Sequence, residues 1–497
     1  MGGAAVHNVI CSNRDTAGPC CRPPTYHGET IFYGALVFLI SLIIIFNPHG
    51  YDAKEVWWHL KAGEVTVKRG FIAFDPFSHT TSAWLNYNWL ADLFFYVVHT
   101  HFGGINALYL IAFIIFGGLI CALVYTTCLR RSGCMASAVL ITLLVTQDVY
   151  MIALKPHVFS YLFTAWVIFV IYAARDTRLI WTLPVVMSLW ANMHIMFVFG
   201  WLAGLGMVCR AIESKERVKD VSLVFALMLL APLLNPYGYR LYSEVWTLYK
   251  YSNDVMPHLA RLLHLAEFSP PGATWPGYML YLAVAMFVLL INRRQMMVTD
   301  AVLFILVLVM SITQAKYVPY FAIISAGVVS GYIPESFSRR FVLRKAISPR
   351  AAGVVMVGLL IVVGIRLDVF LKNSPNMEKC PVREIEAMKT MGRPQAGKMF
   401  NALDDGQYLI YGLHPQYRTF IDARLHLFSP NVVNDYIKVT RGHIDSERIM
   451  DKYCIDTVIL PKNMYIIKVL RSKGWTMLYE GSERVVLQRP NQYHPVT

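Results

Sequence analysis

The long polar stretch after the first apolar segment, residues 48–86, carries Gly50-Tyr51-Asp52-Ala53-Lys54-Glu55-Val56-Trp57-Trp58-His59-Leu60. It also holds Glu64 and Asp75. Carboxylates and imidazoles therefore stand beside tryptophans in a chain that is otherwise mostly apolar. Because catalysis needs polar side chains gathered in one place, we expect a membrane-embedded enzyme whose active site lies under this loop.

The composition excludes an ordinary soluble globule. Hydrophobic residues make up 56% of the 497 residues, charged residues 15% and aromatic residues 13%, and rings in this number suit anchoring at lipid interfaces. A membrane-spanning helix needs about 20 apolar residues. We expect about eleven such spans, at 31–47, 104–127, 135–152, 157–174, 179–193, 195–212, 219–234, 276–292, 298–314, 318–334 and 351–369.

The expected fold is an α-helical polytopic membrane domain with a small soluble domain at its C-terminus. Residues 1–30 read as a cytoplasmic tail and 31–370 as the transmembrane domain, with 48–103 as its first outer loop. Residues 86–102 within that loop suit a helix lying in the membrane interface. From 371 to 497 short apolar runs alternate with helical patterns, which predicts an α/β domain.

The basic residues predict the orientation, because Lys and Arg in short loops stay cytoplasmic. With the N-terminus inside, Arg130-Arg131, Lys215-Glu216-Arg217 and Arg293-Arg294 all fall on the cytoplasmic side. The C-terminal domain is then exoplasmic, in a plasma or inner membrane, and there Cys380 and Cys454 are able to pair in an oxidising compartment. The net charge of +14 is spread over loops, which argues against a nucleic-acid partner.

Several motifs together resemble a known family. They are Asp52-x4-Trp57-Trp58-His59-Leu60-x2-Gly63, Gly70-x4-Asp75-Pro76-Phe77-Ser78, Lys155-Pro156-His157-Val158-Phe159-Ser160, Trp190-Ala191-Asn192-Met193-His194, Leu234-Asn235-Pro236-Tyr237-Gly238, Asp405-Gly406-x-Tyr408-Leu409-Ile410 and Phe420-Ile421-Asp422-x-Arg424. In this order the motifs resemble bacterial and archaeal members of the GT-C superfamily of integral-membrane glycosyltransferases. Lys155 and His157 depart from the pattern, since the similar motif there has Arg and Gln.

The resemblance implies a polyprenyl-phosphate-linked sugar donor, bound from the outer leaflet. The sugar would pass to a glycan, lipid or protein acceptor on the exoplasmic side, with Asp52 as base or acceptor-positioning group. A carboxylate within hydrogen-bond reach of an attacking hydroxyl typically accelerates a reaction by about 10²–10⁴-fold. We take Asp75 as the second candidate catalytic residue. No cofactor is firmly predicted, and a divalent metal is compatible with the loop acids.

The donor phosphate calls for cations, because charge develops on it as it leaves. Lys155, Arg240 and Lys316 fall near span ends on the outer side, where a charge is costly unless it faces a partner or cavity. We expect one or more of them to bind the phosphate. The further candidates for substrate contact are His59, His157, Asn192, His194 and Tyr317.

Each candidate also has a purely structural interpretation. Asp52 is a favoured helix N-cap, Asp75-Pro76 opens a turn, and His59, His194 and Asn192 suit interfacial or interhelical hydrogen bonds. Asp404-Asp405-Gly406 is more typical of a turn than of a metal or acceptor site. Two other functions stay open: a transporter or flippase of a polar or lipid-linked substrate, and a non-catalytic membrane assembly protein.

Overall fold

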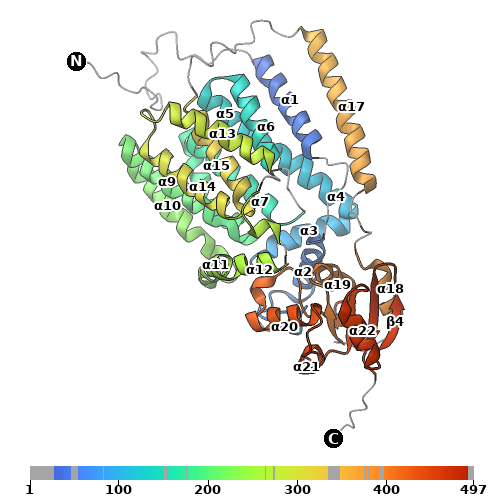
Figure 1. Ribbon diagram of the computed structural model, residues 1–497. Coiled ribbons are helices and arrows are strands. Elements are labelled where there is room, and N and C mark those ends of the chain that lie inside the picture. The colour runs from blue at the N-terminus through green and yellow to red at the C-terminus, as the bar shows by residue number, and fades with distance from the viewer. Residues whose placement is uncertain are drawn as a thin grey trace, which may run out of the picture. The chain divides into compact units, whose positions relative to one another are not determined.

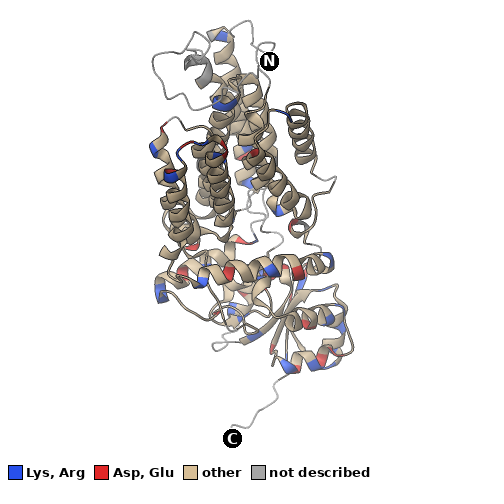
Figure 2. Cartoon of the chain, turned by 90° about the vertical axis from the view of Figure 1, so that its left-hand side faces the viewer, with Lys and Arg blue, Asp and Glu red and all other residues tan. Residues whose placement is uncertain are grey.

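The computed structural model describes residues 27–45, 54–81, 83–149, 154–174, 176–263, 265–272, 275–333, 348–373, 377, 380–390 and 397–490. The chain divides into two compact units (Figure 1). The helical unit comprises Met1–His49 and Tyr109–Lys372, and the mixed unit comprises Gly50–Leu108 and Asn373–Thr497. Charged residues are sparse along the helices of the helical unit and frequent in the mixed unit (Figure 2).

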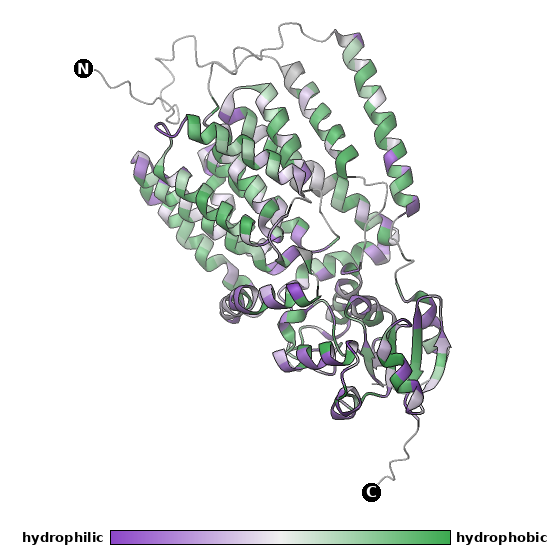
Figure 3. Cartoon of the chain, viewed as in Figure 1, coloured by the Kyte–Doolittle hydropathy of each residue, from purple (hydrophilic) through white to green (hydrophobic). Residues whose placement is uncertain are grey.

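Helices form at every position where an apolar run predicted one. They are α1 (His27–Ile45), α4 (Gly104–Leu110) continued by a π-helical turn (Ile111–Gly117) into α5 (Gly118–Ser132), α6 (Met135–Val149), α7 (His157–Tyr172), α8 (Thr182–Met193), α9 (Val198–Ser214), α10 (Val218–Leu230), α13 (Pro276–Ile291), α14 (Val298–Thr313), α15 (Val318–Ser330) and α17 (Pro349–Asn373). Two further helices, α11 (Arg240–Lys250) and α12 (Met256–Leu263), lie between the expected spans 219–234 and 276–292. Apolar residues predominate along most of these helices (Figure 3).

Among the described residues, three helices are long and apolar enough to cross a membrane by length and composition: Gly104–Ser132, Ile195–Ser214 and Arg350–Asn373. Shorter apolar helices of 10–17 residues are Ile31–Ile45, Met135–Gln147, His157–Tyr172, Pro276–Ile291, Val298–Thr313 and Ala315–Ser330. The mostly helical fold with a small C-terminal sheet is thereby confirmed. About eleven spans, at about 20 apolar residues each, stay a prediction.

Helix α15 forms the centre of the helical unit. All its residues are buried, and it packs against α5, α6, α7 and α14. A Cβ added at Gly327 would lie 2.6 Å from Ile168 and 3.2 Å from Tyr172, both on α7. Only glycine therefore permits this close approach of the two helices, as small residues commonly do between helices in membranes.

The mixed unit contains a five-stranded sheet in the order β2-β1-β3-β5-β4. The strands are β1 (Gly397–Asn401), β2 (Tyr417–Arg418), β3 (Thr457–Pro461), β4 (Thr476–Glu480) and β5 (Arg484–Gln488). The first three pair in parallel, and β5 and β4 join them antiparallel. The helices are α2 (Val56–Arg69), α3 (Trp89–His101), α18 (Val382–Thr390), α19 (Gly406–Leu413), α20 (Pro430–Thr440), α21 (Ser446–Lys452) and α22 (Tyr465–Ser472).

Helices cover both faces of this sheet. Met399 of β1 packs in one core cluster with Ile385 of α18 and Leu409 of α19. The next residue, Phe400, points to the opposite face because side chains alternate along a strand, and its ring stacks on Tyr436 of α20 with centroids 5.7 Å apart. The predicted α/β architecture is thus present, with α18 and α19 on one face and α20 on the other.

The first outer loop extends the edge of the sheet. Ser78 forms a parallel bridge with Thr419, His79 N donates to Thr419 O at 3.1 Å, and Thr419 N donates to Phe77 O at 2.9 Å. The hydroxyl of Thr80 donates to Phe420 O at 2.7 Å. The sequence analysis assigned this loop to the transmembrane domain; in the structure it shares a compact unit with the C-terminal segment.

Candidate functional site

Helix α2 carries three different faces, which explains its density of aromatic and polar residues. Trp57 contacts Tyr411 of α19, with ring centroids 4.9 Å apart. Trp58 packs with Phe77 and Ile410 in a buried cluster. On the third face Gly63 lies so close to α3 that an added Cβ would be 2.3 Å from the carbonyl oxygen of Asp92. The residues on either side of α2 are fixed in position by these contacts.

Asp52, the predicted base, lies outside the described residues, so the description of the loop begins at Lys54. The ammonium of Lys54 binds Asp404 at 3.1 Å. Asp404 belongs to the Asp404-Asp405-Gly406 sequence, which is a 3-10 turn (Leu403–Asp405) that leads into α19. The turn interpretation of this motif is confirmed, and the adjacent Asp405 is bound by Arg484 at 2.8 Å.

Asp75, the second predicted catalytic residue, is buried in an ion cluster. Arg424 donates to its two carboxylate oxygens at 2.9 and 3.1 Å, and Phe77 N and the Thr81 hydroxyl donate at 3.0 and 2.6 Å. Asp422 binds the same guanidinium at 2.9 and 2.7 Å. With four donors on two oxygens, the Asp75 carboxylate is fully engaged.

The guanidinium of Arg424 is enclosed by aromatic rings. It lies 5.5 Å from the ring centroid of Trp58, 5.2 Å from Phe77 and 5.5 Å from Trp84, distances at which a cation is attracted by the ring face. Burial and the nearby Arg424 charge lower the pKa of His426 to about 3. The imidazole is therefore neutral at neutral pH.

His59, a candidate for substrate contact, is bound inside the pair of helices α2 and α3. Its Nδ1 lies 2.6 Å from Asp92 Oδ1, and Asn86 donates to the other oxygen at 2.8 Å. All three side chains are buried. Burial raises the pKa of Asp92, against the effect of His59 and Asn86. The sequence analysis did not select Asp92, although a carboxylate inside an apolar helix was a signal for it.

In the helical unit, two predicted phosphate ligands meet at one short turn, Ala266–Phe268. Lys155 binds Glu267 at 2.9 Å. The ammonium of Lys316 lies 4.4 Å from the ring of Phe268 and 4.9 Å from that of Tyr317, and it donates to the hydroxyl of Ser252 at 2.8 Å. Glu267 was not among the predicted site residues, because a single carboxylate in a long loop forms no recognisable motif.

Three further candidates lie at or near the ends of α7 and α8. The rings of His157 and His194 are 4.1 Å apart, and Ser160 lies 2.7 Å from His194 Nδ1. Asn192 donates to the carbonyl of Ser188 at 2.8 Å, one turn back along its own helix. Arg240 begins α11 and is exposed.

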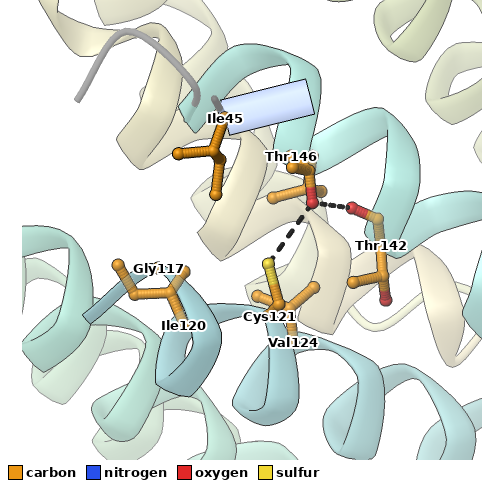
Figure 4. A pocket seen from close by; sticks show the side chains of 8 residues that line it. Ile45, Gly117, Ile120, Cys121, Val124, Thr142 and Thr146 are labelled. Carbon is orange, nitrogen blue, oxygen red and sulfur yellow. Dashed lines mark hydrogen bonds between the residues drawn. The ribbon is translucent and has the colours of Figure 1, made fainter. Parts of the chain in front are cut away.

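A small cavity between α1, α5 and α6 is lined mainly by apolar side chains (Figure 4); in it Cys121 and Thr146 are hydrogen-bonded at 3.5 Å. It contains none of the predicted site residues. Within the described part of the chain, no group of three or more His, Cys, Asp or Glu side chains is arranged to hold a metal ion. Cys380 and Cys454 are both thiols.

No protein-family model and no curated protein matches the sequence. Solved structures do match. The Archaeoglobus fulgidus oligosaccharyltransferase, in a complex with Zn and sulfate, is 12% identical, with a TM-score of 0.51 over 86% of this chain and 68% of its own. ArnT from Cupriavidus metallidurans in the apo state is 12% identical, with a TM-score of 0.52 over 93% of this chain and 99% of its own.

Both TM-scores are above 0.5, and both matches extend over most of this chain. At this identity the likeness concerns the fold, and it covers the helical unit and the C-terminal segment together. The resemblance found in the sequence motifs is confirmed at that level. The chain shares its fold with the oligosaccharyltransferase and with ArnT.

Proposed function

We propose that this protein is an integral-membrane glycosyltransferase that moves a sugar from a polyprenyl-phosphate-linked donor to an acceptor on the exoplasmic side. The observation that carries the proposal is the fold likeness to two membrane glycosyltransferases over 86% and 93% of the chain. The ordered series of loop motifs supports it independently, because those motifs gather polar side chains next to apolar helices.

The lysine pair supports a phosphate-bearing donor. Glu267, on the turn Ala266–Phe268, forms an ion pair with Lys155 at 2.9 Å, and its charge also acts on the ammonium of Lys316. Lys316 donates to a neutral hydroxyl, and its other close contacts are aromatic rings. Two cations beside one carboxylate leave an excess of positive charge, which is unfavourable in a partly buried place, and a phosphate oxygen would supply the second anion. We assign the donor phosphate to Lys155 and Lys316, with Tyr317 beside it.

The chemistry requires one base. In this mechanism Asp52 accepts the proton of the acceptor hydroxyl while its oxygen attacks the anomeric carbon, and the bond from that carbon to the phosphate oxygen breaks. The polyprenyl phosphate leaves with the electron pair as a stable anion, so the second, protonated carboxylate of glycoside hydrolases is not needed. Asp75 then serves to position the loop through Arg424, and His59 to hold α2 against α3.

The remaining candidates are assigned by their place in the helical unit. His157 and His194 form a pair of imidazoles at the start of α7 and the end of α8, and we assign them to substrate contact with Asn192. Arg240 is exposed at the start of α11, where we assign it to the lipid-phosphate headgroup.

The test is Asp52→Asn in the purified, reconstituted protein, with Asp220→Asn as matched control because Asp220 is an exposed carboxylate paired with Arg217 on its own helix turn. We expect D52N to reduce transfer from a polyprenyl-phosphate sugar by about 10²–10⁴-fold while donor binding is retained. Wild-type turnover in D52N would overturn the assignment of the base. Proton- or ion-coupled movement of the donor without transfer would favour a transporter instead.

A further inference from the structure

The sheet of the mixed unit has a topological switch point. The strands lie in the order β2-β1-β3. After β1 the chain forms β2 on one side of it, and it then crosses back and forms β3 on the other side. The connecting helices lie on opposite faces, with α19 on one and α20 on the other. In open α/β sheets, ligands bind outside the carboxyl ends of the strands at this point. Here that place is occupied by residues 402–405 and the start of α19.

Gln407, in the first turn of α19, carries a buried polar atom that lacks a partner. The residue is 5% exposed, and within the described chain its Oε1 accepts no hydrogen bond. Residues three and four positions later share its helix face. These are Ile410, which packs in the cluster of Trp58, and Tyr411, which contacts Trp57. The side chain of Gln407 is therefore on the face of α19 that meets α2.

Trp57, at the facing end of α2, carries the complementary group. It is also 5% exposed, and its Nε1 donates no hydrogen bond to any described residue. Its ring is held by Tyr408 and Tyr411, with centroids 5.0 and 4.9 Å apart. The ion pair of Lys54 and Asp404 joins the segments that precede the two helices. Within the described residues, one donor on α2 and one acceptor on α19 thus stand unpaired in the first turns of two helices that pack together.

We propose that Trp57 Nε1 and Gln407 Oε1 bind a hydroxyl group of a saccharide acceptor. A hydroxyl both accepts and donates a hydrogen bond, so a single hydroxyl satisfies the indole N–H and the amide oxygen together. Trp57, Tyr408 and Tyr411 supply an aromatic wall with an apolar body and polar tips. The cations near these residues, Lys54 and Lys61, are already bound to Asp404 and Glu64, which makes the place unsuited to a phosphate. The inference rests on the proposed function and selects a glycan from its three acceptor classes.

The experiment measures binding of methyl pyranosides of glucose, galactose, mannose and N-acetylglucosamine to the full-length protein in nanodiscs, by isothermal titration. Trp57→Phe keeps an aromatic ring and removes the N–H, and Gln407→Met keeps the size and removes the oxygen. Each should weaken the best pyranoside about fivefold to tenfold, the effect of one lost hydrogen bond. Trp246→Phe and Gln295→Met, both at exposed positions, should leave its Kd unchanged.

Deoxy analogues of the best pyranoside identify the hydroxyl. Removing the bound hydroxyl should weaken binding to the wild type more than binding to W57F, because in W57F the hydroxyl keeps only its hydrogen bond to Gln407. If no pyranoside binds saturably, or if both site variants bind as the wild type does, the proposal is overturned. A W57F protein that fails to fold leaves Q407M and its deoxy series as the deciding measurement.

The two proposals fail separately. Transfer of a sugar from a polyprenyl-phosphate donor with an unchanged acceptor KM in W57F and Q407M would remove the subsite and leave the glycosyltransferase. Pyranoside binding that depends on Trp57 and Gln407, in a protein that transfers no sugar from any such donor, would remove the transferase and leave a saccharide-binding site.

Discussion

Arg424 binds both carboxylate oxygens of Asp75, at 2.9 and 3.1 Å, and the two residues are 349 positions apart in the sequence. The pair joins the first outer loop to the C-terminal segment within one compact unit. Asp422 shares the guanidinium, so two carboxylates are balanced by one cation in a buried place. Substitutions of Arg424 and of Asp75 should therefore destabilise the protein by different amounts.

Arg424→Met should destabilise the protein more than Asp75→Asn. Loss of the arginine leaves two buried carboxylates without their cation, and breaking a buried pair in this way costs about 3–5 kcal/mol. D75N leaves the arginine paired with Asp422 and loses hydrogen bonds worth about 1–3 kcal/mol. Arg441→Met, at an exposed position, is the control. Denaturant unfolding followed by tryptophan fluorescence gives the order, and equal losses would contradict the charge argument.

The C-terminal segment should not fold alone. Thr419, directly after the edge strand β2, forms backbone hydrogen bonds with Phe77 and His79 of the loop at 2.9 and 3.1 Å, and Arg424 would lose Asp75. A protein of residues 373–490 should therefore show no cooperative thermal transition. The same segment fused to residues 54–102 should show one, measured by circular dichroism. The fusion carrying D75N is the matched control and should melt lower. A cooperative transition in the isolated segment would show that the loop is dispensable.

Acid should destabilise the mixed unit through its neutral histidines. Burial lowers the pKa of His79 to about 4 and that of His414 to about 4, and burial with the Arg424 charge lowers that of His426 to about 3. The unfolded chain has its histidine pKa near 6.5 and so binds more protons than the folded one below that pH. Stability is then complete above about pH 6.5 and falls toward pH 4.

Each such histidine contributes at most about 1.4 kcal/mol per pH unit in that window. His426→Gln removes one of these contributions, so its unfolding free energy should depend less steeply on pH between 6.5 and 4 than that of the wild type. His443→Gln is the control, because His443 is about half exposed. Denaturant unfolding at several pH values measures the slopes. Parallel slopes for H426Q and the wild type would show that His426 is protonated in the folded protein.

The apolar runs in the sequence were enough to predict the helices that they form. They did not show which side chains the polar residues contact. Apolar runs placed the helices that centre on α15, and motif order indicated the fold. Lys155 and Lys316 were selected because charge near a span end is costly. Asp75 was predicted as a site residue because other carboxylates lie in the same loop of the sequence. Its partner Arg424 comes close to it only when the sheet folds. Such pairings depend on contacts between distant segments, which a single sequence does not display.

If Lys155 and Lys316 hold the donor phosphate, removing either lysine should weaken donor binding, whereas removing the charge of Glu267 should strengthen it. Lys316→Ala and Lys155→Ala each remove a charged donor, and hydrogen bonds to charged groups are worth about 1.5–3 kcal/mol, so the Kd for a polyprenyl-phosphate sugar should rise by at least about tenfold. Glu267→Gln should lower that Kd, because Glu267 competes with the phosphate for Lys155 at 2.9 Å. Lys250→Ala, at an exposed position on α11, is the control. Flotation of the protein with donor-containing vesicles measures the affinities. Unchanged binding in both lysine variants, or weaker binding in E267Q, would show that the phosphate is held elsewhere.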